Sequence, residues 1–111
     1  MSICIPTLDE EAWIGHALRS ARASAAEASV PVEIIVCDGG SRDDTLREAE
    51  RHGADVVCRS PRRGRAFQLN HAARRASGEV IALHHADSML TGGCIRKMME
   101  SVRGGSVGGW F

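Results

Sequence analysis

An unbroken apolar run at residues 34–37 (Ile-Ile-Val-Cys) constrains the fold more than any other stretch of the chain. Such a run fits a strand that is buried on both faces, as in a parallel sheet covered by helices. The run ends at Asp38, and Gly39 and Gly40 follow where the backbone turns sharply or approaches a ligand closely. Because open α/β sheets bind ligands at the carboxyl ends of their strands, Asp38 is a candidate binding residue. The alternative is a turn residue whose carboxylate bonds its own backbone.

Apolar runs and helical spacings alternate along the rest of the chain. Strands are expected at residues 3–5, 32–37, 54–58 and 80–83, with a fifth entered at 107–111. Helices are expected between Asp9 and Val30 and over 43–52, 66–76 and 95–102. This alternation predicts an α/β fold with three layers, α/β/α, around a mainly parallel, Rossmann-like sheet with right-handed crossovers. A chain of 111 residues is expected to form a single domain, 1–111.

Single residues mark the expected ends of these elements. Pro6 closes the first apolar run and is expected to end the first strand. Asp9 is expected to cap the first helix, and Ser41 or Asp43 the second. Gly53 is a plausible stop for the second helix.

Composition narrows the classes of protein and partner. Hydrophobic residues make up 43% and charged residues 25% of the chain, which is ordinary for a soluble domain. The 14 basic and 14 acidic residues balance, so no overall field attracts nucleic acid or a membrane surface. No apolar run reaches membrane-spanning length, and no transmembrane segment or signal peptide is expected. A cytoplasmic location is expected, with peripheral attachment at the inner membrane face as the alternative.

The cysteines, Cys4, Cys37, Cys58 and Cys94, include no Cys-x-x-Cys pair. Their spacing predicts neither a zinc site nor a secreted disulfide framework, in keeping with a reducing compartment. Cys37 is expected to be an inert core residue, and His71 to lie at the surface or at an interface.

A second carboxylate stands where another strand ends. Asp87 follows the strand expected at 80–83 as Asp38 follows its own, so both should reach the same edge of a parallel sheet. Together they could hold a hard divalent cation or hydrogen-bond a polar ligand. His85 precedes Asp87 by two residues, and a His-x-Asp pair can bind a divalent metal, with manganese or zinc favoured over magnesium. The alternative is that His84 and His85 finish the strand and Asp87 caps the next turn.

Basic and amide side chains cluster between the third strand and the third helix. Arg62, Arg63 and Arg65 surround Gly64 at a turn that enters a helix, where arginines can clamp phosphate. Within that helix, the amides at positions 68 and 70 are suited to reading a base or a sugar. The alternative is a solvated surface. No P-loop or Gly-x-Gly-x-x-Gly sequence occurs, so an ATPase and a dinucleotide site are unsupported.

Taken in order, four segments resemble the motifs of glycosyltransferase family 2. Residues 5–10 resemble the Pro-x-x-Asn-Glu loop, with Asp9 where Asn is usual, and residues 36–45 resemble the Val-Asp-(Asp/Gly)-(Gly/Ser)-Ser-x-Asp-x-Thr signature. Residues 64–70 resemble the segment that borders the nucleoside, and residues 83–87 fall where the family has its Asp-x-Asp metal motif.

The resemblance implies the nucleotide-binding half of a GT-A glycosyltransferase that uses a nucleotide-diphosphate sugar donor, usually with inversion at the anomeric carbon. It implies that Asp38 hydrogen-bonds the base and that Asp87 binds Mg2+ or Mn2+ across the diphosphate. The donor site implied in this way consists of Pro6, Thr7, Glu10, Asp38, Gly39, Arg65, Gln68, Asn70 and His85, with Asp87 as the metal ligand.

This sequence departs from the family pattern in two places. His85 stands at the first acidic position of the metal motif, as in a bacterial branch with Leu-His-Ala-Asp. The family's acceptor half, with its catalytic base, is expected beyond Phe111, so no catalytic residue is assigned and the acceptor is unknown. The alternative function is a non-catalytic nucleotide-binding or regulatory module of the same fold. A nucleotidyltransferase is disfavoured, since its Gly-rich loop after the first strand is missing.

The end of the chain is rich in glycine and finishes with Trp110 and Phe111. Exposed aromatic side chains and an unpaired strand edge invite partners. Self-association through the C-terminal end is therefore expected.

Overall fold

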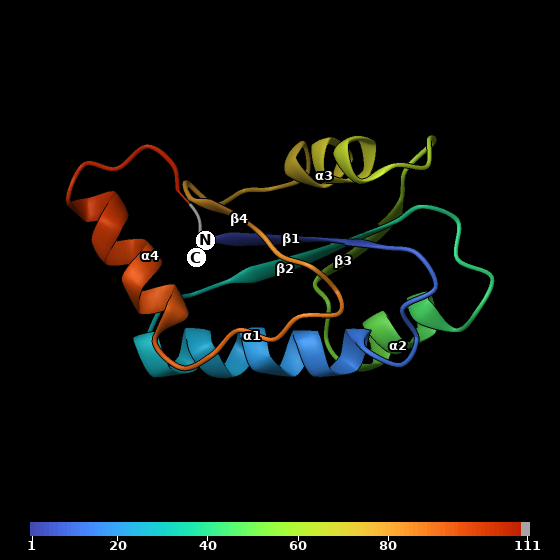
Figure 1. Cartoon of the computed structure of the whole chain (residues 1–111), viewed down its shortest axis with the longest axis horizontal. Helices are drawn as coiled ribbons and strands as arrows, with labels where there is room; N and C mark the ends of the chain where they lie inside the picture. The colour runs from blue at the N-terminus through green and yellow to red at the C-terminus, as the bar shows by residue number, and fades with distance from the viewer. Residues whose placement is uncertain (110–111) are drawn as a thin grey trace.

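The computed structural model describes residues 1–109. Four parallel strands form one sheet in the order β3-β2-β1-β4, and helices cover both of its faces (Figure 1). The elements are β1 (Ser2–Thr7), α1 (Ile14–Ala28), β2 (Glu33–Asp38), α2 (Thr45–Arg51), β3 (Val56–Arg59), α3 (Arg65–Ala73), β4 (Ile81–Leu83) and α4 (Cys94–Arg103). The predicted three-layer α/β/α fold with a parallel sheet is confirmed.

Alternate side chains of the central strands enter two separate cores. Ile34 and Val36 of β2 pack with Ile14 and Leu18 of α1 on one face of the sheet. Ile35 and the cysteine that follows Val36 join a smaller core on the other face, beneath α3. In Figure 1, α3 lies above the sheet, and α1 and α2 lie below it. The apolar run therefore fills both faces of the strand, as predicted.

Pro6 does not end β1, contrary to expectation. The strand continues to Thr7, and Pro6 is paired with Cys37 of β2. On the other side, the pairing of β1 with β4 runs from Ser2 to Cys4 and stops there. The N–H of Ser2 points to the side of the strand on which β4 lies. Alternate residues of a strand direct their N–H groups to the same side, so the nitrogen of Pro6 also faces that side, past the end of β4. A missing N–H costs no ladder hydrogen bond there, which is why a central strand tolerates this proline.

The other expected boundaries change in detail. α1 begins at Ile14 without a side-chain cap, and Asp9 instead accepts a hydrogen bond from the N–H of Arg42 (2.8 Å). α2 begins at Thr45, and its N-cap position is occupied by Asp44, whose side chain makes no capping hydrogen bond. Neither Ser41 nor Asp43 is therefore the N-cap. Asp43 accepts from the N–H of Thr45 (3.0 Å) in a local turn. Asp9 thus bonds across to the loop after β2, and Asp43 forms a local turn, in place of the caps expected from the sequence.

The end of the chain also differs from the expectation. Residues 107–109 form no strand, and Trp110 and Phe111 lie outside the described residues. α3 ends at Ala73 rather than Ala76. Within residues 1–109, no helix combines the length and the apolar character needed to cross a bilayer.

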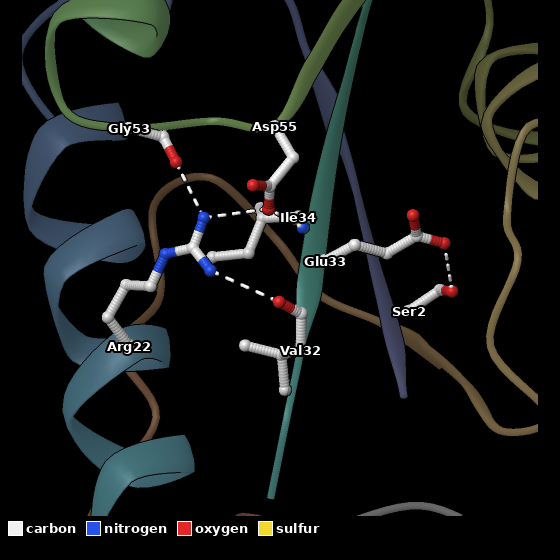
Figure 2. A network of polar contacts seen from close by, with 7 residues as sticks. All are labelled: Ser2, Arg22, Val32, Glu33, Ile34, Gly53 and Asp55. Carbon is white, nitrogen blue, oxygen red and sulfur yellow. Dashed lines mark hydrogen bonds and ion pairs between the residues drawn. The ribbon is translucent and has the colours of Figure 1, made fainter.

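A polar network fastens α1 to the sheet at the edge opposite the carboxyl ends of the strands (Figure 2). Arg22 donates to the carbonyl oxygens of Val32 (3.2 Å) and Gly53 (2.6 Å) and to the carboxylate of Asp55 (2.7 Å). Asp55 also accepts from the N–H of Ile34 (2.7 Å). One guanidinium thus joins the loops that enter β2 and β3, and the opposite edge of the sheet is left open to form a site.

Candidate functional site

A cavity of about 230 Å³ opens at the carboxyl edge of the sheet. Its walls come from three places: the end of β1 with the loop after it, the turn that enters α3, and the segment that follows β4. The lining residues are Pro6, Thr7, Leu8, Glu10, Arg63, Gly64, Arg65, Gln68, His85, Ala86 and Asp87.

Most of the residues implied by the resemblance meet in this cavity. Those that line it are Pro6, Thr7, Glu10, Arg65, Gln68, His85 and Asp87. Asp38, Gly39 and Asn70 do not line it, and Asn70 is exposed on α3. Arg63 is an addition from the basic segment that the sequence had already marked. Leu8, Gly64 and Ala86 have no polar or charged side chain that would mark them as site residues in the sequence. They line the cavity because they lie next to residues that do have one.

Asp38 is wholly buried at the end of β2, and its carboxylate is held by neighbouring donors. Oδ1 accepts from the hydroxyls of Thr7 (2.8 Å) and Ser41, and Oδ2 accepts from the N–H groups of Gly40 (2.9 Å) and Ser41 (2.7 Å). Burial raises the pKa of Asp38, but the hydrogen bonds from Ser41, Thr7 and Gly40 outweigh it and hold the pKa below its usual value. In this structure the carboxylate shapes the turn after β2 and fixes Thr7, which faces the cavity.

Gln68 has a similar internal role at the base of the cavity. Its Nε2 donates to the carbonyl oxygens of Thr7 (2.8 Å) and Cys37 (3.0 Å), and its Oε1 accepts from the N–H of Gly64 (3.3 Å). The amide therefore joins α3 to the ends of β1 and β2. A Cβ at Gly39 would lie 2.7 Å from Oε1 of Gln68, so a larger residue there would push this amide away from its hydrogen-bond partners.

Opposite charges line the cavity. Arg63 comes from the turn before α3 and Arg65 from the first position of that helix, while Glu10 and Asp87 come from the loops after β1 and β4. Burial and the nearby negative charge of Asp87 raise the pKa of Glu10. The neighbouring Arg62 stacks on Phe67, with 4.1 Å from its guanidinium carbon to the ring centroid, and is not among the lining residues.

Two adjacent histidines follow β4 and differ in their surroundings. His84 is buried, and its Nε2–H donates to the carbonyl oxygen of Ser88 (3.0 Å). Burial, helped by the charge of His85, lowers the pKa of His84 below its usual value. His85 and Asp87 are exposed and line the cavity together. His85, Asp87 and Glu10 supply one imidazole ring and two carboxylates to this side of the cavity.

The sequence matches the family described as Glycosyl transferase family 2 over residues 2–109. A curated relative, 4,4'-diaponeurosporenoate glycosyltransferase of Staphylococcus aureus, is 44% identical over 57 residues, which are 51% of this chain and 14% of that protein. The fold is that of the GT-A glycosyltransferases, and the chain belongs to glycosyltransferase family 2.

Solved structures resemble this chain over most of its length. Staphylococcus aureus TarS 1-349 superimposes with a TM-score of 0.77 at 23% identity, over 93% of this chain and 32% of that one. Glucosyl-3-phosphoglycerate synthase of Mycobacterium tuberculosis gives a TM-score of 0.75 at 25% identity, over 91% of this chain and 39% of that one. The chain therefore spans well under half of the length of these proteins.

Proposed function

We propose that the cavity binds a nucleotide-diphosphate sugar and that the chain supplies the donor-binding part of a glycosyltransferase. The observation that carries the proposal is the charge arrangement of the cavity, in which Arg63 and Arg65 share one pocket with Glu10 and Asp87. A metal-bridged diphosphate needs both kinds of group, because its oxygens bind arginine and its cation binds carboxylate. Family membership supports this assignment.

The metal is part of the same proposal. The synthase from Mycobacterium tuberculosis has been solved with Mn2+, UDP and phosphoglyceric acid, at a TM-score of 0.75 and 25% identity over 91% of this chain. We assign Asp87 as the metal ligand here, with His85 beside it. Burial and then the negative charge of Asp87 raise the pKa of Glu10, and a cation between the two carboxylates would relieve the repulsion part of this effect. When bound, Mg2+ or Mn2+ would neutralise charge on the departing diphosphate.

The remaining residues position the donor. Arg63 and Arg65 bind the phosphates, and Thr7 and Pro6 form the wall that leads to the end of β1. Asp38 holds Thr7 in place, and contact between its carboxylate and the base would require the turn at residues 39–41 to open. Asn70 and Gly39 reach the donor only if it extends past the cavity. The acceptor and the catalytic base are left unassigned.

Calorimetric titration of UDP and of GDP into the chain, with and without Mn2+, tests this proposal. We expect saturable binding that needs Mn2+, and at least about tenfold weaker binding after Asp87→Asn or Arg65→Ala. Glu100→Gln on α4 and Arg74→Ala at the end of α3 are matched controls, because both residues are exposed and neither lines the cavity. Absence of binding by either nucleotide, or equal losses in the control variants, would refute the assignment.

A further inference from the structure

A second group of metal-ligating side chains lies beneath α3, within the smaller core. Cys37 and Cys58 are direct register partners on the adjacent parallel strands β2 and β3. His71 comes from α3, which packs over this face of the sheet (Figure 1). One ligand atom from each of the three residues lies within 4.8 Å of the other two. None of the three lines the donor cavity.

An unpartnered nitrogen belongs to this group. Nε2 of His71 is buried, and among the described residues it is the one buried side-chain nitrogen or oxygen that has no hydrogen-bond partner. A buried polar atom without a hydrogen-bond partner is rare in folded proteins, since leaving it unpaired costs free energy. The thiols offer little relief, since the Sγ of Cys58 donates toward the carbonyl oxygen of Val36 at 3.6 Å. A bound cation would give the imidazole nitrogen the partner that it lacks.

The ligand set selects the class of metal. Two cysteine sulfurs and one imidazole form a soft set that suits Zn2+ or another thiophilic ion and not Mg2+. A tetrahedral Zn2+ with bonds of about 2.3 Å to sulfur would hold the two sulfurs roughly 3.8 Å apart. The ligand atoms therefore need to move inward by about an ångström at most from the 4.8 Å within which they lie. Cys58 and His71 are partly exposed, so the group lies close to the protein surface.

We propose that Cys37, Cys58 and His71 form a three-ligand site for a thiophilic metal ion, best fitted by Zn2+, with water in the fourth position. On binding, each thiol forms a metal–sulfur bond and releases one proton to solvent, and the imidazole of His71 donates a nitrogen lone pair. The ion joins α3 to β2 and β3. Because α3 also carries Arg65 and Gln68, loading this site stiffens one wall of the donor cavity.

Titration of Co2+ into the reduced, metal-free chain tests the site by absorption spectroscopy. We expect one Co2+ per chain with sulfur-to-cobalt charge-transfer bands and the intense d–d bands of tetrahedral coordination, which added Zn2+ abolishes. Cys58→Ser and His71→Asn should each weaken binding at least about tenfold. These variants carry the test because the side chain of Cys37 is wholly buried, and a polar replacement there would disturb the core.

Two controls separate this site from the donor cavity. Cys94→Ser on α4 and Asp87→Asn should both leave the charge-transfer bands unchanged, because neither residue belongs to the group. Zn2+ should also raise the melting temperature of the wild-type chain and not that of His71→Asn. Absence of charge-transfer bands in the reduced wild-type chain, or their persistence in both Cys58→Ser and His71→Asn, would overturn the proposal.

Discussion

The carboxylate of Asp38 stabilises the turn that closes β2, and removing it should cost a large part of the chain's stability. It is wholly buried and accepts four hydrogen bonds, from the hydroxyls of Thr7 and Ser41 and the N–H groups of Gly40 and Ser41. Bonds to a charged acceptor contribute about 1.5–3 kcal/mol each and are not additive within one group. We therefore expect Asp38→Ala to lower the free energy of unfolding by about 3–5 kcal/mol.

Asp38→Asn separates the charge from the shape of the side chain. The amide oxygen can still accept from Gly40 and Ser41, and the two hydroxyls can rotate to accept from its NH2 group. Neutral hydrogen bonds are about half as strong as charge-assisted ones, so we expect a loss of about 1–2 kcal/mol.

The same reasoning fixes the pH dependence. Since the folded pKa of Asp38 lies below the usual 3.8, its stabilisation is present above that value and is lost as the pH falls through the folded pKa. The difference between wild type and Asp38→Asn should therefore be constant at neutral pH and shrink below pH 3.8.

Urea unfolding measured at several pH values checks this series. Asp44→Asn is the matched control, because Asp44 is exposed in the same loop and makes no side-chain capping bond. We expect it to stay within about 0.5 kcal/mol of wild type. An Asp38→Ala chain no less stable than the control, or a wild-type-to-Asn difference that grows toward low pH, would refute the role given to this carboxylate.

Two further predictions concern the packing of the sheet ends. Gly39→Ala should destabilise the chain by about 1–3 kcal/mol, since its Cβ would lie 2.7 Å from Oε1 of Gln68. Gly108→Ala, where no atom lies within 4 Å, should be neutral in the same thermal unfolding assay, and equal effects would contradict the packing account. At the opposite edge, hydrogen bonds from Ser2 and then Ser77 lower the pKa of Glu33 from 4.5 to about 2. The stabilisation by the Glu33 carboxylate is therefore full above pH 4.5 and is lost as the pH falls toward 2. Glu33→Gln should differ from wild type in its urea midpoint at pH 7 and approach the wild-type value near pH 2. A difference in urea midpoint that does not change with pH would contradict this role.

The layers of the fold were predicted from short-range patterns, and most of the cavity from the resemblance to the family motifs. Alternating runs predicted the parallel sheet, and strand ends predicted that Asp38 and Asp87 share one edge. Most of the other cavity-lining residues were implied by the resemblance to the family motifs. The role of Asp38 could not be decided from sequence, because it depends on the register that places Thr7 opposite it. The turn-forming alternative describes the observed hydrogen bonds, and direct contact with a base stays a prediction.

Contacts between distant segments were the part that sequence could not supply. Asp9 bonds to Arg42 across two loops instead of capping its own helix. Cys37, Cys58 and His71 are far apart in the chain, and only strand register with the packing of α3 brings them together. Self-association through the C-terminal end also stays a prediction, and light scattering of the purified chain would measure it.

The central claim is that one cavity holds the donor diphosphate with a cation at Asp87. Mn2+ is paramagnetic and broadens the NMR signals of nearby amides, so a 15N-labelled chain with UDP and substoichiometric Mn2+ reports the ion's position directly. We predict selective broadening at the amides of Leu8 and Glu10 and of residues 63–65 and 85–87, which line the cavity. This pattern should be lost in Asp87→Asn and kept in Glu100→Gln. Broadening centred away from these segments, or unchanged by Asp87→Asn, would contradict the account.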